Sequence, residues 1–169
     1  TIIAPEGYAY YAAFKEEKGY DKYRKILLLD FGSRTIDTVD IVNGTAVKPD
    51  SIPEMGTISL MDKIRETGIS LDNVELDIML KEGLYELGNT IYRKEDFKSE
   101  IDRYARLSHQ LITQKYGDLK SFQKIIIIGG GSYLVGDIFK KYYPELVEVV
   151  EKAEFAIADA YYELSFLKC

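Results

Sequence analysis

The residues best suited to chemistry lie where apolar runs give way to small and polar residues. In the segment Leu27–Ile41, LLLDFGSRTIDTVDI, a predicted buried strand delivers Asp30 to its end, and Gly32, Ser33 and Thr35 then turn the backbone. Small residues let backbone N–H groups approach phosphate oxygens, and hydroxyl groups add donors. A carboxylate at the end of a strand can hold a hydrated Mg²⁺ ion. The segment suits a phosphate with its metal ion, although such a turn is more often only a hairpin.

For each of two charged residues in the same segment, the sequence allows two alternative roles. Arg34 either adds positive charge to the turn or faces solvent. Asp37 stands on the following predicted strand, where it either helps to hold a cation or is satisfied by the backbone.

A second segment, Ile125–Asp137, IIIIGGGSYLVGD, places three glycines after an aliphatic run. Consecutive glycines cost backbone entropy, so Gly129, Gly130 and Gly131 indicate a place where a ligand or another backbone comes close. A helix predicted to start near Ser132 offers free N–H groups to an anion. The spacing does not fit a dinucleotide fingerprint, because Leu134 stands where that motif needs Gly or Ala.

The elements that must position these segments follow an α/β order. Asn43-Gly44, which favours a two-residue hairpin turn, joins two strands of an antiparallel meander. Ser59-x-x-Asp62 is a plausible capping box for a helix that begins after Gly56. The predicted strands are 1–3, 25–30, 35–42, 45–52 and 125–128, and the predicted helices are 5–18 (stopped at Gly19), 59–66, 78–87, 94–116, 134–142 and 154–166.

Composition narrows the class of protein. The chain has 169 residues, 46% of them hydrophobic and 30% charged, which is enough for one domain with a buried core. The net charge of −6 disfavours direct binding to nucleic acid or to an anionic membrane. The longest aliphatic run is far too short to span a membrane, and we expect no secretory signal, because no basic region followed by a hydrophobic one stands at the start of the sequence. With one cysteine, Cys169, and one histidine, His109, we expect a cytoplasmic protein without a metal cluster or a nucleophilic triad.

Four segments of the sequence, in the order in which the family has them, resemble parts of the actin/heat-shock-chaperone/sugar-kinase superfamily. Asp30–Asp37 resembles its second phosphate loop, and Gly129–Ser132 resembles its adenosine loop. The stretch that starts Ala4-Pro5-Glu6-Gly7 is similar to its interdomain helix, and Ala153–Leu164 is similar to the terminal helix of ParM/StbA-type plasmid actins. Lys48–Lys63 also resembles the turn and helix that follow the third strand in that branch.

The resemblance implies a fold. It is a ribonuclease H-like, actin-type lobe in which a mixed sheet, an antiparallel meander plus parallel strands, is flanked by helices. Residues 1–169 would form the C-terminal lobe, with a small peripheral helical subdomain at about 68–123.

The resemblance also implies roles for single residues. Glu6 would orient the water that attacks the γ-phosphate, and Asp30 would hold Mg²⁺ through water. ATP or ADP would be bound by Gly32, Ser33, Arg34 and Thr35 at the phosphates and by Gly129, Gly130, Gly131 and Ser132 at the adenosine, with Tyr133 near the adenine. Along the predicted helix 94–116, the charged residues within Lys94–Arg106, including Lys98, Asp102 and Arg103, would face the ribose and base or simply face solvent.

The implied activity is ATP hydrolysis by a filament of like subunits that moves plasmid copies apart through a DNA-bound adaptor protein. The first phosphate loop of the family has no counterpart here, so the 169-residue chain alone is expected to bind nucleotide weakly and to hydrolyse it negligibly. Other members of the superfamily remain alternatives: a cell-shape actin, a chaperone-like ATPase or a small-metabolite kinase. A scaffold that kept the fold and lost hydrolysis is a further alternative.

Overall fold

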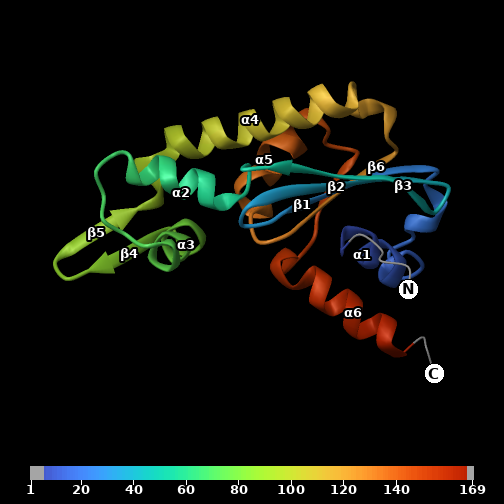
Figure 1. The fold of residues 1–169 in the computed structure, drawn as a ribbon, viewed down its shortest axis with the longest axis horizontal. Helices are drawn as coiled ribbons and strands as arrows, with labels where there is room; N and C mark the ends of the chain where they lie inside the picture. Colours follow the sequence, from blue (N-terminus) through green and yellow to red (C-terminus); the bar gives the residue numbers. More distant parts are fainter. Residues whose placement is uncertain (1–5, 167–169) are drawn as a thin grey trace.

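A five-stranded mixed sheet forms the centre of the computed structural model, which describes residues 6–166 (Figure 1). Its strand order is β3-β2-β1-β6-β7. The meander β1–β2–β3 is antiparallel, and β6 and β7 continue the sheet parallel to β1. The strands are β1 (Lys25–Phe31), β2 (Thr35–Val42), β3 (Thr45–Pro53), β6 (Lys124–Ile128) and β7 (Val147–Val149). The mixed sheet predicted from the sequence is confirmed.

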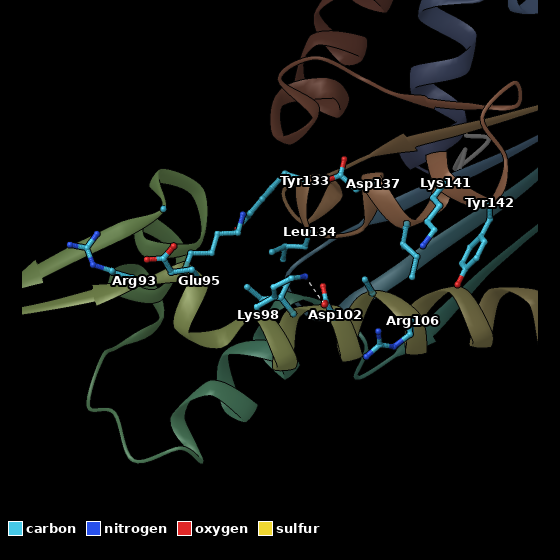
Figure 2. Close-up of a pocket in the computed structure, with 15 residues that line it drawn as sticks. Arg93, Glu95, Lys98, Asp102, Arg106, Tyr133, Leu134, Asp137, Lys141 and Tyr142 are labelled. Carbon is cyan, nitrogen blue, oxygen red and sulfur yellow. Dashed lines mark hydrogen bonds and ion pairs between the residues drawn. The ribbon is translucent and has the colours of Figure 1, made fainter.

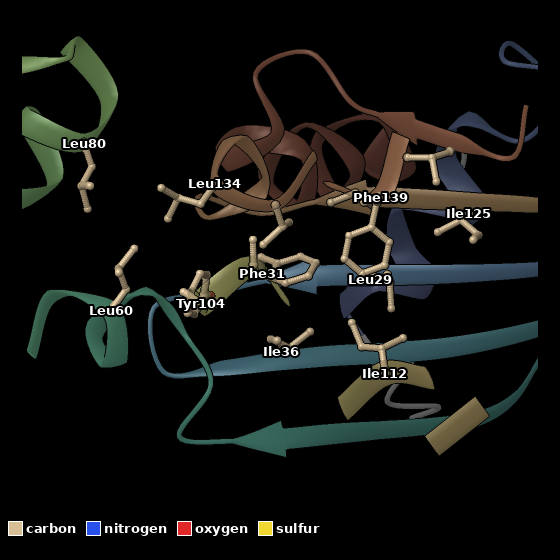
Figure 3. Close-up of a cluster of buried hydrophobic side chains, with 14 of the residues drawn as sticks. Leu29, Phe31, Ile36, Leu60, Leu80, Tyr104, Ile112, Ile125, Leu134 and Phe139 are labelled. Carbon is tan, nitrogen blue, oxygen red and sulfur yellow. The ribbon is translucent and has the colours of Figure 1, made fainter. Parts of the chain in front are cut away.

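One face of the sheet is covered by three helices, α2 (Thr57–Arg65), α4 (Lys98–Tyr116) and α5 (Ser132–Tyr142). Alternate residues of β1 and β6 point to this face, because successive strand residues face opposite sides. The resulting core includes Leu29, Phe31, Ile36, Leu60, Ile112, Ile125, Leu134 and Phe139 (Figure 3). The same packing fixes the ends of β1 and β6, where the candidate site lies.

The other face is covered by α1 (Glu6–Phe14) and α6 (Ala156–Phe166), which pack against each other (Figure 1). Their core takes the opposite set of strand residues, among them Ile26, Leu28, Val39, Ile41, Ile126 and Ile128. Gly7 of α1 lies so close to the sheet that a Cβ there would come within 2.5 Å of Leu28 Cδ2. The first turn of α1 is thereby held over the middle of the β1–β2 pair, where Leu28 and Val39 are cross-strand partners.

A small helix and hairpin project from one end of the sheet (Figure 1). They are α3 (Asn73–Glu82), β4 (Leu84–Leu87) and β5 (Thr90–Arg93), and the hairpin strands pair only with each other. A capping box between Asp72 and Glu75 starts α3. The chain then passes into α4, which runs back along the sheet (Figure 1). The proposed boundaries of a peripheral subdomain at 68–123 stay a prediction.

Several predicted elements are corrected by the structure. The helix expected at 78–87 lies at 73–82, and residues 84–87 are a strand. Regular helix α1 ends at Phe14 rather than at residue 18; a further turn closes at Gly19, whose φ of 63° confirms it as the stop. Ser59 does not cap α2, because its hydroxyl donates to the carbonyl of Gly56 instead of accepting a bond. The strand expected at 1–3 lies outside the described residues.

Candidate functional site

The two glycine segments meet at one edge of the sheet. β1 and β6 are parallel neighbours with Asp30 paired to Ile128, so the loops that follow them leave the sheet side by side. The N–H group of Gly131 donates to the carbonyl oxygen of Phe31 at 2.9 Å, which ties the glycine loop to the end of β1, immediately before the other loop. The ends of parallel strands are where α/β proteins commonly bind ligands.

The space around the three glycines of the second loop differs, so glycine is needed at some of these positions and not at others. Gly129 has a φ of +90°, and a Cβ there would lie 2.2 Å from Oδ1 of Asp30. A Cβ on Gly131 would lie 2.7 Å from Cγ2 of Thr57. Gly130 is open, since the nearest atom to its Cβ position is Cβ of Glu154 at 3.9 Å. Close approach of neighbouring side-chain and backbone atoms therefore explains two glycines, and of the three only Gly130 leaves space for a ligand.

The loop from Gly32 to Thr35 is held by the start of α2. The N–H groups of Gly56, Thr57 and Ile58 donate to the carbonyls of Arg34, Gly32 and Ser33 at 2.9–3.1 Å. A Cβ on Gly56 would lie 2.3 Å from the backbone of Ser33 and Arg34, so only glycine fits there.

This arrangement determines which hydrogen-bond donors of the loop remain available to a bound anion. The N–H of Gly32 is taken, because it donates to the carbonyl of Thr35 at 3.0 Å. The side chains of Ser33 and Arg34 are exposed, and within residues 6–166 their N–H groups donate to no backbone carbonyl. The hydroxyl of Thr35 donates to Oδ2 of Asp37 at 3.3 Å. Donors toward an anion thus come from Ser33 and Arg34 rather than from Gly32.

An acidic cavity of about 340 Å³ opens beside this loop. Glu6 from α1, Asp30 from β1 and Asp37 from β2 line it, and Asp30 and Asp37 are direct cross-strand partners. The lining contains no basic residue: it comprises Glu6, Gly7, Asp30, Asp37, Thr38, Val39, Pro49, Asp50 and Ser51. The structure therefore brings the two predicted catalytic residues into one cavity together with Asp37, for which the sequence had left a cation-holding role open.

Burial and like charge act together on the carboxyl of Asp30. Desolvation, followed by the negative charges of Asp37 and Glu6, raises its pKa from 3.8 to about 6. A carboxylate in such surroundings is stabilised by any cation that enters the cavity. Within the described part of the chain, no three His, Cys, Asp or Glu side chains are already arranged to hold a metal ion.

A larger groove of about 720 Å³ lies between α4 and α5 (Figure 2). Tyr133, the residue predicted to lie near an adenine, stands on its wall, and the ammonium of Lys94 lies 5.2 Å from the centre of the tyrosine ring. Lys98 and Asp102 also line the groove and pair with each other at 2.6 Å, whereas Arg103 is not among the lining residues. The remaining polar or charged lining side chains are Arg93, Glu95, Arg106, Asp137, Lys141 and Tyr142.

Sequence reasoning included Lys94 in the charged stretch Lys94–Arg106 but missed the exposed side of α5. The only signal for that side was helical spacing, since Asp137 and Lys141 follow Tyr133 by four and eight residues. The hydroxyl of Tyr133 is buried without a hydrogen-bond partner, and burial raises its pKa.

His109 lines neither cavity. Its ring packs against Phe139 and Tyr142, and its Nε2 lies 2.9 Å from the hydroxyl of Tyr143. Burial lowers its pKa, which favours the neutral ring. A packing role fits these contacts.

The fold with two glycine loops at one sheet edge is that of one lobe of the actin-like ATPases of ParM type. An archaeal actin homologue, Ta0583, superposes with a TM-score of 0.75 at 20% identity, over 98% of this chain and 56% of the homologue. The ParM filament from Clostridium botulinum superposes with a TM-score of 0.73 at 22% identity, over 95% of this chain and 51% of ParM.

A complex of Ta0583 with ADP gives a TM-score of 0.73 at 23% identity, over 94% of this chain and 55% of the homologue. The chain thus spans about half the length of the solved structures that it matches. No family model matches the sequence, and no curated protein matches it either. Among the helices of residues 6–166, none combines the length and hydropathy that crossing a membrane requires.

Proposed function

We propose that this chain is the ATP-binding C-terminal lobe of a filament-forming actin-like ATPase that segregates plasmid DNA through a DNA-bound adaptor. One observation carries the proposal: the two glycine loops are joined at one sheet edge, with the acidic cavity beside them. Solved neighbours include an archaeal actin homologue with ADP, Bacillus thuringiensis ParM with ATP and a ParM filament. These neighbours support a nucleotide ligand and self-assembly.

The phosphates would lie against the first loop. The N–H groups of Ser33 and Arg34 point to no backbone acceptor, and the Arg34 side chain is exposed, so both residues can donate to phosphate oxygens. Gly130 would face the adenosine, because it is the glycine with open space. The base would extend toward Tyr133, on whose ring a planar group can stack.

The residues present fit a hydrated Mg²⁺ ion. Asp30 carries a raised pKa in a cavity lined by acidic and no basic residues, so a divalent cation would remove unfavourable charge there. Bound Mg²⁺ would neutralise charge on the phosphates during transfer to water. Mg²⁺ keeps several of its waters, which suits a carboxylate that acts through water.

The protein groups would then position the attacking water. Glu6 stands at the start of α1 on the same cavity as Asp30, and a carboxylate there accepts a hydrogen bond from water and orients it. Asp37 holds the hydroxyl of Thr35 and so helps to set the shape of the loop. Hydrolysis would time the disassembly of the filament.

The test uses the full-length protein. Asp30→Ala should abolish ATP hydrolysis while circular dichroism shows an intact fold, and Asp50→Ala, a change in the same cavity at a residue paired with Lys115, should retain most activity. An unchanged ATPase rate in Asp30→Ala would remove that residue from its role. The 169-residue chain alone should bind ATP weakly and show no robust turnover.

The segregation function has its own test. ATP-dependent pelleting of the full-length protein would establish assembly, and a neighbouring gene for a small basic DNA-binding adaptor would support plasmid segregation. ATP binding without turnover in calorimetry would instead identify a scaffold that kept only the fold.

A further inference from the structure

Helix α1 makes a very close contact with the sheet at Gly7, in its first turn. Gly7 is buried, and a Cβ there would lie 2.5 Å from Cδ2 of Leu28 on β1 and 3.5 Å from Cγ2 of Val39 on β2. Glycine is a poor helix former, because it loses more backbone freedom on folding than any other residue. Contact with the sheet therefore explains why a glycine stands in this helix.

The side chain of Leu28 has little room to give way. It is fully buried in the core of this sheet face, where its partners on the neighbouring strands, Val39 and Ile126, are buried as well. Protein interiors are close-packed, so a displaced methyl group would meet other atoms there. Non-bonded carbon atoms rest about 3.5–4.0 Å apart, so a side chain at residue 7 would lift the first turn of α1 by about 1 Å.

The remainder of α1 is anchored at several points. The hydroxyl of Tyr8 donates to the carbonyl of Gly44 at 2.9 Å, in the turn between β2 and β3. The ring of Tyr10 packs against that of Tyr20, with centroids 6.5 Å apart, and the hydroxyl of Tyr20 donates to Oε1 of Glu148 on β7 at 2.7 Å. Helix α6 packs along α1 as well. A lift at the first turn would therefore tilt that turn and not move the whole helix.

The first turn carries Glu6, the carboxylate next to Gly7. Glu6 and Gly7 line the acidic cavity together with Asp30. Leu28 and Asp30 lie on the same face of β1, because residues two apart in a strand share a face. The contact between Gly7 and Leu28 thus sets the position of the Glu6 carboxylate relative to Asp30.

We propose that Gly7 is a positioning residue for ATP hydrolysis: its missing side chain lets α1 rest on Leu28, and this contact holds Glu6 at the distance from Asp30 that the attacking water requires. The proposal rests on the proposed function, in which Glu6 orients that water. Gly7 acts through Glu6 and touches neither nucleotide nor water itself. A misplacement of a catalytic group by about 1 Å can lower a rate by about a hundredfold, so the position of the first turn matters for turnover.

Adding a methyl group at residue 7 and removing one at residue 28 tests the proposal in the full-length protein. Gly7→Ala should lower kcat by about ten- to a hundredfold, because Glu6 is displaced. The Kd for ATP should change by less than about twofold, since the loss is confined to the transition state. Leu28→Val alone, which removes the methyl group that residue 7 would meet, should keep kcat near that of the parent. The double variant Gly7→Ala with Leu28→Val should recover most of the lost kcat, because the added methyl group then has space.

Three outcomes of these measurements would overturn the positioning role. The first is an unchanged kcat in Gly7→Ala. The second is a double variant that stays as slow as Gly7→Ala although it is folded by circular dichroism. The third is a loss of kcat in Gly7→Ala that only matches its unfolded fraction in urea denaturation, which would show that Gly7 serves packing alone.

Crystal structures of the same variants separate this inference from the proposed function, because they need no turnover. In Gly7→Ala the Glu6 carboxylate should move away from Asp30 by about 1 Å, and in the double variant it should return. Absence of ATP hydrolysis in the parent, together with this displacement, defeats only the proposed function. Hydrolysis by the parent with Glu6 in the same place in both structures defeats only the positioning role of Gly7.

Discussion

The two loops at the sheet edge reach a fixed shape by different means. The loop at Gly129–Gly131 is fixed by β1, with Asp30 and Phe31 occupying the space that side chains would need. The loop at Gly32–Thr35 is fixed from outside, by three N–H groups at the start of α2. A requirement for glycine can therefore lie within a loop, as at Gly129, or in the segment that supports it, as at Gly56.

The largest expected effect comes from Gly129→Ala. The added Cβ meets Oδ1 of Asp30 at 2.2 Å and the backbone of Phe31 at 2.7 Å, at a φ of +90°. We expect unfolding free energy to fall by about 2–5 kcal/mol, measured by urea denaturation. Gly130→Ala is the matched control in the same loop, and it should cost less than about 1 kcal/mol because its Cβ position is open. Equal losses in the two variants would contradict this account of the loop.

Gly56→Ala tests the external support of the other loop. Its Cβ would lie 2.3 Å from the backbone of Ser33 and Arg34, so the loop must shift. We expect a loss of about 2–3 kcal/mol in thermal or chemical unfolding. Gly68→Ala offers a comparison with open space but positive φ, which isolates backbone strain from contact. If Gly56→Ala loses no more than Gly68→Ala, contact with the loop is unimportant.

Asp30→Asn tests the charge that stands between the two loops. Because the folded-state pKa of about 6 lies above 3.8, the folded protein holds this proton more tightly, and stability falls as pH rises from 3.8 through 6. At pH 7.5 the neutral variant should be more stable by up to about 3 kcal/mol, with the difference vanishing near pH 4. Melting curves across this pH range give the measurement. A difference independent of pH would rule out titration of Asp30 as the cause.

The smallest effect is expected far from both loops, at the start of α3. Asp72→Ala removes the acceptor for the N–H of Glu75 and should cost about 1 kcal/mol. Ser59→Ala is the comparison, since Ser59 lies in the first turn of α2 without acting as a cap, and it should cost less. Chemical denaturation of both variants decides the order. A larger loss in Ser59→Ala would show that its bond to Gly56 supports the loop.

Much of the fold was accessible from the sequence because its signals are local and strong. The aliphatic runs of β1 and β6 predict buried strands, and Asn43-Gly44 takes positive φ at both positions, 48° and 78°, as its hairpin requires. The β4–β5 hairpin was missed although Gly88-Asn89 separates its strands, because two four-residue strands with mostly exposed side chains show little periodicity. Three-residue β7 gives no periodicity at all.

The sequence predicted the residues of the candidate site better than it predicted the contacts between them. The sequence named Glu6 and Asp30, and the structure places them in one cavity with Asp37. Nothing local in the sequence distinguishes Gly130 from Gly129 and Gly131, because their difference depends on Phe31 and Thr57, which are distant in the chain. The exclusion of Arg103 from the groove likewise depends on how α4 turns against α5. The ligand roles of these residues stay predictions.

The single hydrogen bond from Gly131 to Phe31 has a mechanical consequence. It ties the loop after β6 to the end of β1, immediately before the Gly32–Thr35 loop. A displacement of the Gly129–Gly131 loop is therefore passed to the start of the other loop, and we expect the two loops to move together.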